Sequence, residues 1–252
     1  NLGAKKIIIG IGGSATNDGG AGMLQALGFQ FYNSKNNVVI PSGGMLGSIA
    51  RIEPPSTLPT KGIELILACD VNNPSTGPLG ATMVYAKQKG ARDKDLEELE
   101  SGMVHYAQLV EEITNSVVTG VEGFGAAGGV PISACSFLNA ELVSGSKLIF
   151  DALKMEGAIK NANVVITGEG KIDAQTNYGK AIIPIIECAA RMNKNLILVC
   201  GVFEEVRNHL AEITRYELSQ IAEKRGMNSF ADAYDLCFEI GRQIGFNLQK
   251  QR

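Results

Sequence analysis

The chain has 252 residues, of which 45% are apolar and 19% are charged, as in an ordinary globular protein with a sizeable core. Its formal net charge of −3, with no block of five like charges, argues against a broad surface for nucleic acid or an anionic membrane. The longest apolar runs fall far short of the roughly 20 residues that a membrane span needs. We therefore expect small-molecule chemistry.

The cysteine and glycine content gives two further indications about the kind of protein. The five cysteines form no C-x-x-C pair, which is typical of reduced core thiols and favours a cytoplasmic location. Thirty residues are glycine, well above the usual share of about 7%, and they are clustered. Clustered glycine marks places where the backbone must approach something closely.

In chain order, the predicted strands are short, nearly continuous apolar runs that end in glycine-rich or polar turns. They cover Lys5–Ile11, Ile63–Cys69, Asn163–Ile166 and Leu196–Cys200. Runs of this kind are typical of a parallel sheet covered on both faces. The predicted fold class is therefore α/β.

Helical periodicity predicts helices over Gly19–Leu27, Lys94–Val118, Lys180–Met192 and Ala231–Leu248. In the last helix, Phe230, Tyr234, Cys237, Phe238 and Ile240 are expected to form the apolar face. The alternation of strand and helix resumes after a polar, irregular middle. This predicts two lobes with a boundary near Lys160.

The first segment that could carry chemistry is a glycine-rich loop between the first predicted strand and helix. Glycine backbone at a helix start can form an anion site from free N–H groups. Asp18 can cap the helix or hold a metal ion. A tight turn with a capped helix is the alternative. The candidate binding residues are Gly12, Gly13, Ser14, Thr16 and Asn17.

Three further segments are less decisive. Asp70 and Asn72 follow a predicted strand end, where α/β proteins place their sites. An Asx turn is the alternative for the segment that begins at Asn72, but it does not account for Asp70. Gln88–Gly90 is typical of a helix that ends at glycine. The small residues of Gly123–Gly129 fit a ligand contact or close helix packing equally well.

The fifth segment begins after the strand predicted at Asn163–Ile166. It carries Thr167, Gly168, Glu169 and Asp173, followed by Lys180 on the first turn of a predicted helix. A cation there opposes the helix dipole, so an anionic ligand is a plausible reason for it.

These segments together resemble the bacterial glycerate kinases of the first type. The resemblance runs through essentially all of the chain to Gly201, and five motifs occur in the family's order: Ile9–Gly28, Asp70–Gly80, Gln88–Ala91, Gly125–Gly129 and Thr167–Ala181.

The resemblance implies ATP-dependent phosphorylation of D-glycerate to a phosphoglycerate, with Mg²⁺. It implies two α/β lobes with the site in the cleft between them, one lobe inserted into the other. Residues 1–160 would be the inserted lobe, and residues 161–252 the C-terminal half of a Rossmann-like lobe. The motifs with which family members open do not occur in this sequence, which leaves the N-terminal half of that lobe without a counterpart.

Phosphoryl transfer depends on charge neutralisation and in-line positioning. We expect the Gly12–Asn17 loop and Lys180 to bind phosphate oxygens, and Asp18 or Asp70 to help hold Mg²⁺. Asp173 is the expected base for the glycerate hydroxyl, with Glu169 as its rival.

Two other functions remain open. One is a truncated glycerate- or phosphate-binding fragment without turnover. The other is a nicotinamide-dependent dehydrogenase, although the ribose-binding acid expected about 20 residues after the glycine motif is absent. The phosphorylated hydroxyl and the oligomeric state are not determined by the sequence.

Overall fold

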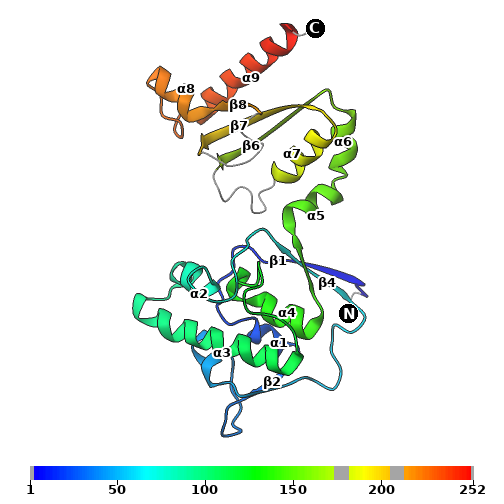
Figure 1. The fold of residues 1–252 in the computed structure, drawn as a ribbon, viewed down its shortest axis with the longest axis vertical. Coiled ribbons are helices and arrows are strands. Elements are labelled where there is room, and N and C mark those ends of the chain that lie inside the picture. The colour runs from blue at the N-terminus through cyan, green and yellow to red at the C-terminus, as the bar shows by residue number, and fades with distance from the viewer. Residues whose placement is uncertain (1–2, 173–181, 205–212, 251–252) are drawn as a thin grey trace. The chain divides into compact units, whose positions relative to one another are not determined.

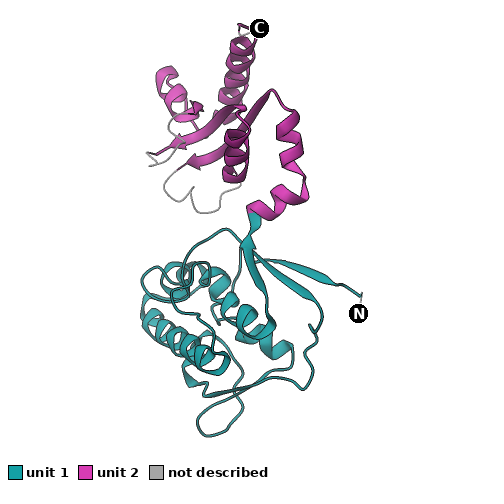
Figure 2. Ribbon diagram, turned by 45° about the vertical axis from the view of Figure 1, so that its right-hand side comes forward, with its two compact units in different colours: residues 1–145 teal, residues 146–252 magenta. Residues whose placement is uncertain are grey.

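A computed structural model describes residues 3–172, 182–204 and 213–250. The chain divides into two compact units, residues 1–145 and 146–252, each of which has its own parallel sheet (Figure 1, Figure 2). The prediction of an α/β fold with parallel sheets is confirmed. The division falls after Gly145, whereas the sequence places the boundary near Lys160. The assignment of the two halves to an inserted and a Rossmann-like lobe stays a prediction.

Unit 1 is built on the parallel strands β1 (Lys6–Gly10), β4 (Glu64–Cys69) and β5 (Glu141–Ser144), in the order β1-β4-β5. Strand β4 is central in this sheet, and its residues Leu65, Ile66 and Leu67 are buried. Both β1 and β4 match predicted strands, and the four-residue β5 is not apparent from the sequence.

The rest of unit 1 consists of helices, a two-stranded antiparallel pair and short turns (Figure 1). Helix α3 (Leu96–Thr114) presents Met103, Tyr106 and Val110 to the core, the face that its periodicity predicts. The other elements are α1 (Ala21–Ala26), α2 (Ala81–Tyr85), α4 (Val130–Leu138), the antiparallel pair β2 (Gln30–Tyr32) and β3 (Arg51–Glu53), and the 3₁₀ turns η1 (Gly43–Ser48), η2 (Lys87–Lys89), η3 (Asp93–Asp95) and η4 (Ala126–Gly128).

Unit 2 carries the parallel strands β6 (Val164–Ile172), β7 (Asn195–Phe203) and β8 (Thr214–Glu217), in the order β6-β7-β8. Side chains of β7 alternate between two cores. Leu198 packs with Ile186 of α7 (Ile182–Arg191), and Ile197 packs with Leu218 of α8 (Leu218–Arg225). This sheet is therefore covered on both faces, as predicted. The remaining helices are α5 (Gly145–Ala152), α6 (Met155–Asn161) and α9 (Ala233–Lys250).

The apolar face predicted for the last helix is correct for Ile240 and wrong for the other four residues. Helix α9 buries Leu236, Ile240 and Ile244, whereas Phe230, Tyr234 and Phe238 are 93%, 82% and 64% exposed and Cys237 is also exposed. The aliphatic residues at spacing i, i+4 and i+8 are the ones that pack with residues of α8 and β7.

All five cysteines are free thiols. Cys188 and Cys200 are buried, whereas Cys237 is exposed, so the expectation of core thiols is wrong for Cys237. Among the described residues, no helix is both long and apolar enough to cross a membrane.

Candidate functional site

The predicted site residues of unit 1 lie on loops that leave the same edge of its sheet. Gly10 pairs with Ala68, and Cys69 pairs with Ser144, so the carboxyl ends of β1, β4 and β5 are aligned. The glycine-rich loop follows β1, and Asp70 follows β4. Ligands of α/β proteins bind at this edge of a parallel sheet.

Asp18 caps the helix that follows the glycine-rich loop. Its Oδ1 accepts a hydrogen bond from the Gly20 N–H at 3.0 Å, and its Oδ2 accepts one from the Gly22 N–H at 3.1 Å. The helix α1 begins at Ala21 and has only six residues. The carboxylate of Asp18 therefore occupies the anion-binding position that the sequence suggests for the helix start.

The glycines of this region fall into two groups. A β-carbon placed on Gly128 would lie 2.0 Å from the Thr16 carbonyl oxygen, and one on Gly19 would lie 2.6 Å from the Tyr106 ring. These glycines are required by packing. In contrast, a β-carbon on Gly12 or Gly13 would meet no atom within 4 Å. The backbone at Gly12–Gly13 thus faces open space that a ligand can enter.

The small-residue loop Gly123–Gly129 holds two of the site loops in place. The Gly19 N–H donates to the Gly128 carbonyl at 2.9 Å, and the Gly125 N–H donates to the Asn73 carbonyl at 2.8 Å. Because a β-carbon on Gly125 would lie 2.2 Å from the Pro74 carbonyl oxygen, no larger residue fits there. The sequence allows a ligand contact or close helix packing here, and these contacts show close packing against neighbouring loops instead.

Lys89 is the functional candidate that the sequence does not single out. Its Nζ donates to Ser14 Oγ at 3.1 Å and to the Thr16 carbonyl oxygen at 2.7 Å. Burial lowers the pKa of this ammonium group, and the negative charge of Asp18 partly offsets the effect. The predicted helix end at Gln88–Gly90 therefore places a half-buried cation against the glycine-rich loop.

Asn17 connects the same loop to α2. Its Nδ2 donates to Thr82 Oγ1 at 3.1 Å, and the Thr82 side chain is fully buried. The Oδ1 of Asn17 is buried and has no hydrogen-bond partner among the described residues. A buried acceptor without a partner costs free energy, so this oxygen is suited to a donor from a ligand or water.

The second loop contains one structural and one exposed asparagine. Asn73 donates from Nδ2 to the Leu79 carbonyl at 2.8 Å and accepts from the Tyr85 hydroxyl at 2.6 Å. The predicted binding residue, Asn72, is exposed, and its side chain makes no hydrogen bond within the described residues. Asp70 Oδ1 accepts from the Ser144 hydroxyl at 3.2 Å. These contacts leave Asn72 free to bind a ligand.

In unit 2 the predicted turn after Ile166 is wrong, because β6 continues to Ile172. Thr167, Gly168 and Glu169 pair with β7 as strand residues. A β-carbon on Gly168 would lie 2.3 Å from the Val199 carbonyl oxygen, so this glycine permits the close pairing. The candidates Asp173 and Lys180 lie outside the described residues.

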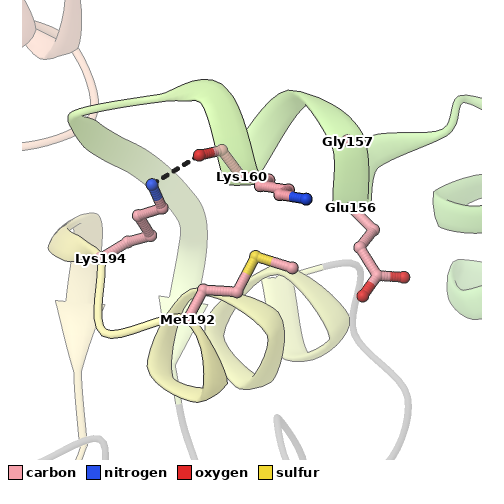
Figure 3. A pocket seen from close by; sticks show the side chains of 5 residues that line it. All are labelled: Glu156, Gly157, Lys160, Met192 and Lys194. Atoms are coloured by element: carbon pink, nitrogen blue, oxygen red, sulfur yellow. Dashed lines mark hydrogen bonds between the residues drawn. The ribbon is translucent and has the colours of Figure 1, made fainter.

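A separate hollow in unit 2, of about 550 Å³, lies between α6 and α7 (Figure 3). Its walls include Met192 and Lys160, and Lys194 Nζ donates to the carbonyls of Lys160 and Ala162 at 2.6 and 2.9 Å. Lys194 thus satisfies carbonyls at the end of α6, as a basic residue at a helix C-terminus commonly does. The hollow contains none of the predicted site residues.

Comparison with known proteins identifies the family of the chain. The sequence model described as the glycerate kinase family matches residues 1–243. The chain belongs to the glycerate kinase family. It is 42% identical over 203 residues to a glycerate kinase of Bacillus subtilis (strain 168), covering 80% of this chain and 53% of that protein. It is 38% identical over 251 residues to a glycerate 2-kinase of Escherichia coli (strain K12), covering 98% of this chain and 65% of that protein.

A solved crystal structure from Salmonella typhimurium LT2, which bears the name glycerate kinase 2, matches with a TM-score of 0.68 and 38% identity. The match covers 85% of this chain and 56% of that one. This member of the glycerate kinase family therefore spans about half to two thirds of the length of the relatives it matches.

A kinase family implies a nucleotide substrate. The described residues contain no group of three or more His, Cys, Asp or Glu side chains that could hold a metal ion. Mg²⁺ in kinases is commonly held by one or two carboxylates together with substrate phosphates, so a single carboxylate suffices. Both predicted metal ligands already make hydrogen bonds: the two oxygens of Asp18 accept backbone N–H groups, and Asp70 Oδ1 accepts from the Ser144 hydroxyl. The choice between Asp18 and Asp70 stays a prediction.

Proposed function

We propose that this chain phosphorylates D-glycerate with ATP and Mg²⁺. The observation that carries the proposal is the family match over residues 1–243, which includes the glycine-rich loop, the Asp70 loop and Lys89. The open backbone at Gly12–Gly13 supports it, because phosphate binding needs free N–H groups without side chains in the way.

In the proposed reaction, an oxygen of the glycerate hydroxyl attacks the γ-phosphorus, and ADP leaves in line with the attack. The Gly12–Asn17 loop and Lys180 bind phosphate oxygens and neutralise their charge. Asp18 or Asp70 would hold Mg²⁺, which supplies further neutralisation when bound. Asp173 accepts the hydroxyl proton, and Glu169 is the alternative base.

The name of the Escherichia coli relative, glycerate 2-kinase, favours the 2-hydroxyl as the acceptor. A cytoplasmic location, where ATP is plentiful and thiols stay reduced, is part of the proposal and agrees with five free cysteines.

The test is ADP release by the full 252-residue chain with ATP, Mg²⁺ and a panel of D-glycerate, glycerol and hexoses. We expect turnover with D-glycerate and with no other compound of the panel. Phosphorus NMR of the product then identifies which hydroxyl of D-glycerate is phosphorylated. Turnover on glycerol or hexoses with none on D-glycerate would refute the substrate.

Two rival functions are tested by separate measurements on the same protein. Calorimetric binding of ATP or D-glycerate without ADP release would support the binding-only fragment. An increase of NADH fluorescence on mixing would support a dehydrogenase.

A further inference from the structure

We infer that the ammonium group of Lys89 directly binds an anionic group of a substrate at the Gly12–Asn17 loop. The ligand chemistry is an oxyanion, either a phosphate of the nucleotide or the carboxylate of glycerate. The inference rests on the proposed function and adds a recognition residue that the expected site, built around Lys180, does not contain.

The first argument is the lack of a counter-charge. Both hydrogen-bond acceptors of Lys89 are neutral, namely the Ser14 hydroxyl and the Thr16 carbonyl. Among the described residues, no carboxylate lies within ion-pair distance of Lys89 Nζ. Asp18 acts on it through its charge, but both oxygens of Asp18 accept backbone N–H groups of the α1 cap. A half-buried cation without an ion-pair partner favours the arrival of an anion.

The second argument is the count of donors. An ammonium group has three N–H donors, and Lys89 uses two of them within the described residues. Because Ser14 Oγ accepts one of these bonds, the hydroxyl proton of Ser14 remains to be donated elsewhere. Lys89 and Ser14 together can therefore present two donors to one oxyanion.

The third argument is space. Ser14 directly follows the two glycines at which an added β-carbon would meet nothing within 4 Å. The loop thus combines open backbone, a hydroxyl donor and a positive charge within a few residues. Charge-assisted hydrogen bonds to an oxyanion are roughly twice as strong as neutral ones.

The alternative is a purely structural role, in which Lys89 only connects the Gly12–Asn17 loop to η2 through its two hydrogen bonds. The two roles are separated by Lys89→Gln, which keeps polar donors but removes the charge, and by Lys89→Arg, which keeps the charge. Lys87→Met is the matched control, because Lys87 lies two residues away on the same 3₁₀ turn and pairs with the exposed Asp93.

The experiment is isothermal calorimetry of the full chain and its variants with ATP plus Mg²⁺ and, separately, with D-glycerate. Circular dichroism and thermal unfolding confirm that each variant is folded. We expect Lys89→Gln to weaken one ligand by about ten- to a hundredfold, the range for losing a hydrogen bond to a charged group. Lys89→Arg should retain most of the affinity, and Lys87→Met should equal the wild type.

The two arms identify the source of the oxyanion. A loss confined to ATP assigns Lys89 to a phosphate, and a loss confined to D-glycerate assigns it to the carboxylate. If the wild type binds both ligands and Lys89→Gln binds them equally well, the inference is wrong while the proposed function stands. If the folded wild type binds neither ligand, the proposed function fails and the inference fails with it.

Discussion

Glycine residues that are indistinguishable in the sequence serve different purposes in this site. Gly19 and Gly128 are needed because Tyr106 and the Thr16 carbonyl leave no room for a side chain. Gly12 and Gly13 face open space, and Gly13 also has a positive φ of 65°. Gly12 is therefore the position where a side chain tests ligand access without straining the backbone.

We expect Gly12→Ala to weaken ATP binding by about tenfold or more, since a methyl group would occupy the space next to the loop N–H groups. The melting temperature should stay close to that of the wild type, because the new β-carbon meets no atom within 4 Å. Calorimetry with ATP and Mg²⁺ provides the measurement.

Gly10→Ala is the control for this variant. Gly10 ends β1, and its β-carbon would also meet no atom within 4 Å, so this variant should bind ATP normally. Equal affinity of Gly12→Ala and wild type would mean that the loop is only a turn.

For catalysis, we expect Asp173→Asn to lower kcat by about 10²–10⁴-fold with little change in the KM for ATP, as loss of a general base does. Steady-state ADP release measures both constants. Glu169→Gln is the comparison variant. If Glu169→Gln loses the activity and Asp173→Asn retains it, the base is Glu169, and if neither loses tenfold, both assignments are wrong.

The sequence predicts the positions of the glycine-rich loop and Asp70 because a strand end followed by a polar turn is a local pattern. It does not predict the contacts of Lys89, which join residues 75 and 73 positions apart. Local propensity at Gln88–Gly90 indicates only a helix end. The motif order hints at a function for this segment, but only the fold shows which loop the lysine contacts.

At the scale of elements, the bounds predicted for β1 and β4 agree with the structure to within one residue, whereas β6 and β7 run past their predicted ends. A glycine after an apolar run predicts a turn, yet β6 and β7 continue through Gly168 and Gly201 to Ile172 and Phe203. The reason is that each strand has a glycine where the other strand comes close. A β-carbon on Gly201 would lie 2.4 Å from the Gly170 carbonyl oxygen, and one on Gly168 would lie 2.3 Å from the Val199 carbonyl oxygen. Glycine permits two strands to approach closely, but a glycine in the sequence does not by itself predict this tertiary contact.

We expect Gly168→Ala to destabilise the chain by about 1–3 kcal/mol, the usual cost of overpacking, because its β-carbon would lie 2.3 Å from backbone. Gly170→Ala, in the same strand, should cost much less, since its β-carbon would meet no atom within 4 Å. Urea unfolding of both variants gives the comparison. Equal stabilities would show that Gly168 is not needed for pairing, and a ligand-binding role would then be its better explanation.

At the scale of the whole molecule, the predicted site residues are distributed over both compact units. The glycine-rich loop, Asp70 and Lys89 belong to unit 1, and Glu169, Asp173 and Lys180 belong to unit 2. Each unit has its own core, so each could in principle bind a ligand by itself. The proposed reaction requires that residues of both units serve the same substrates.

Hydrogen exchange of the full chain tests this requirement. With ADP, Mg²⁺ and D-glycerate added together, no phosphoryl transfer can occur, and we expect slower exchange in peptides covering residues 10–20, 85–92 and 167–180. A ligand at 100 times its Kd stabilises the state it binds by about 2.7 kcal/mol, which is roughly a hundredfold slowing where opening releases the ligand. Peptides from α9 are the internal control, because the apolar cluster of Leu236, Ile240 and Ile244 includes no described residue of these three segments. Equal slowing in α9 would indicate general stabilisation. Slowing confined to residues 10–20 and 85–92 would place the ligands on unit 1 alone and would refute the roles proposed for Glu169, Asp173 and Lys180.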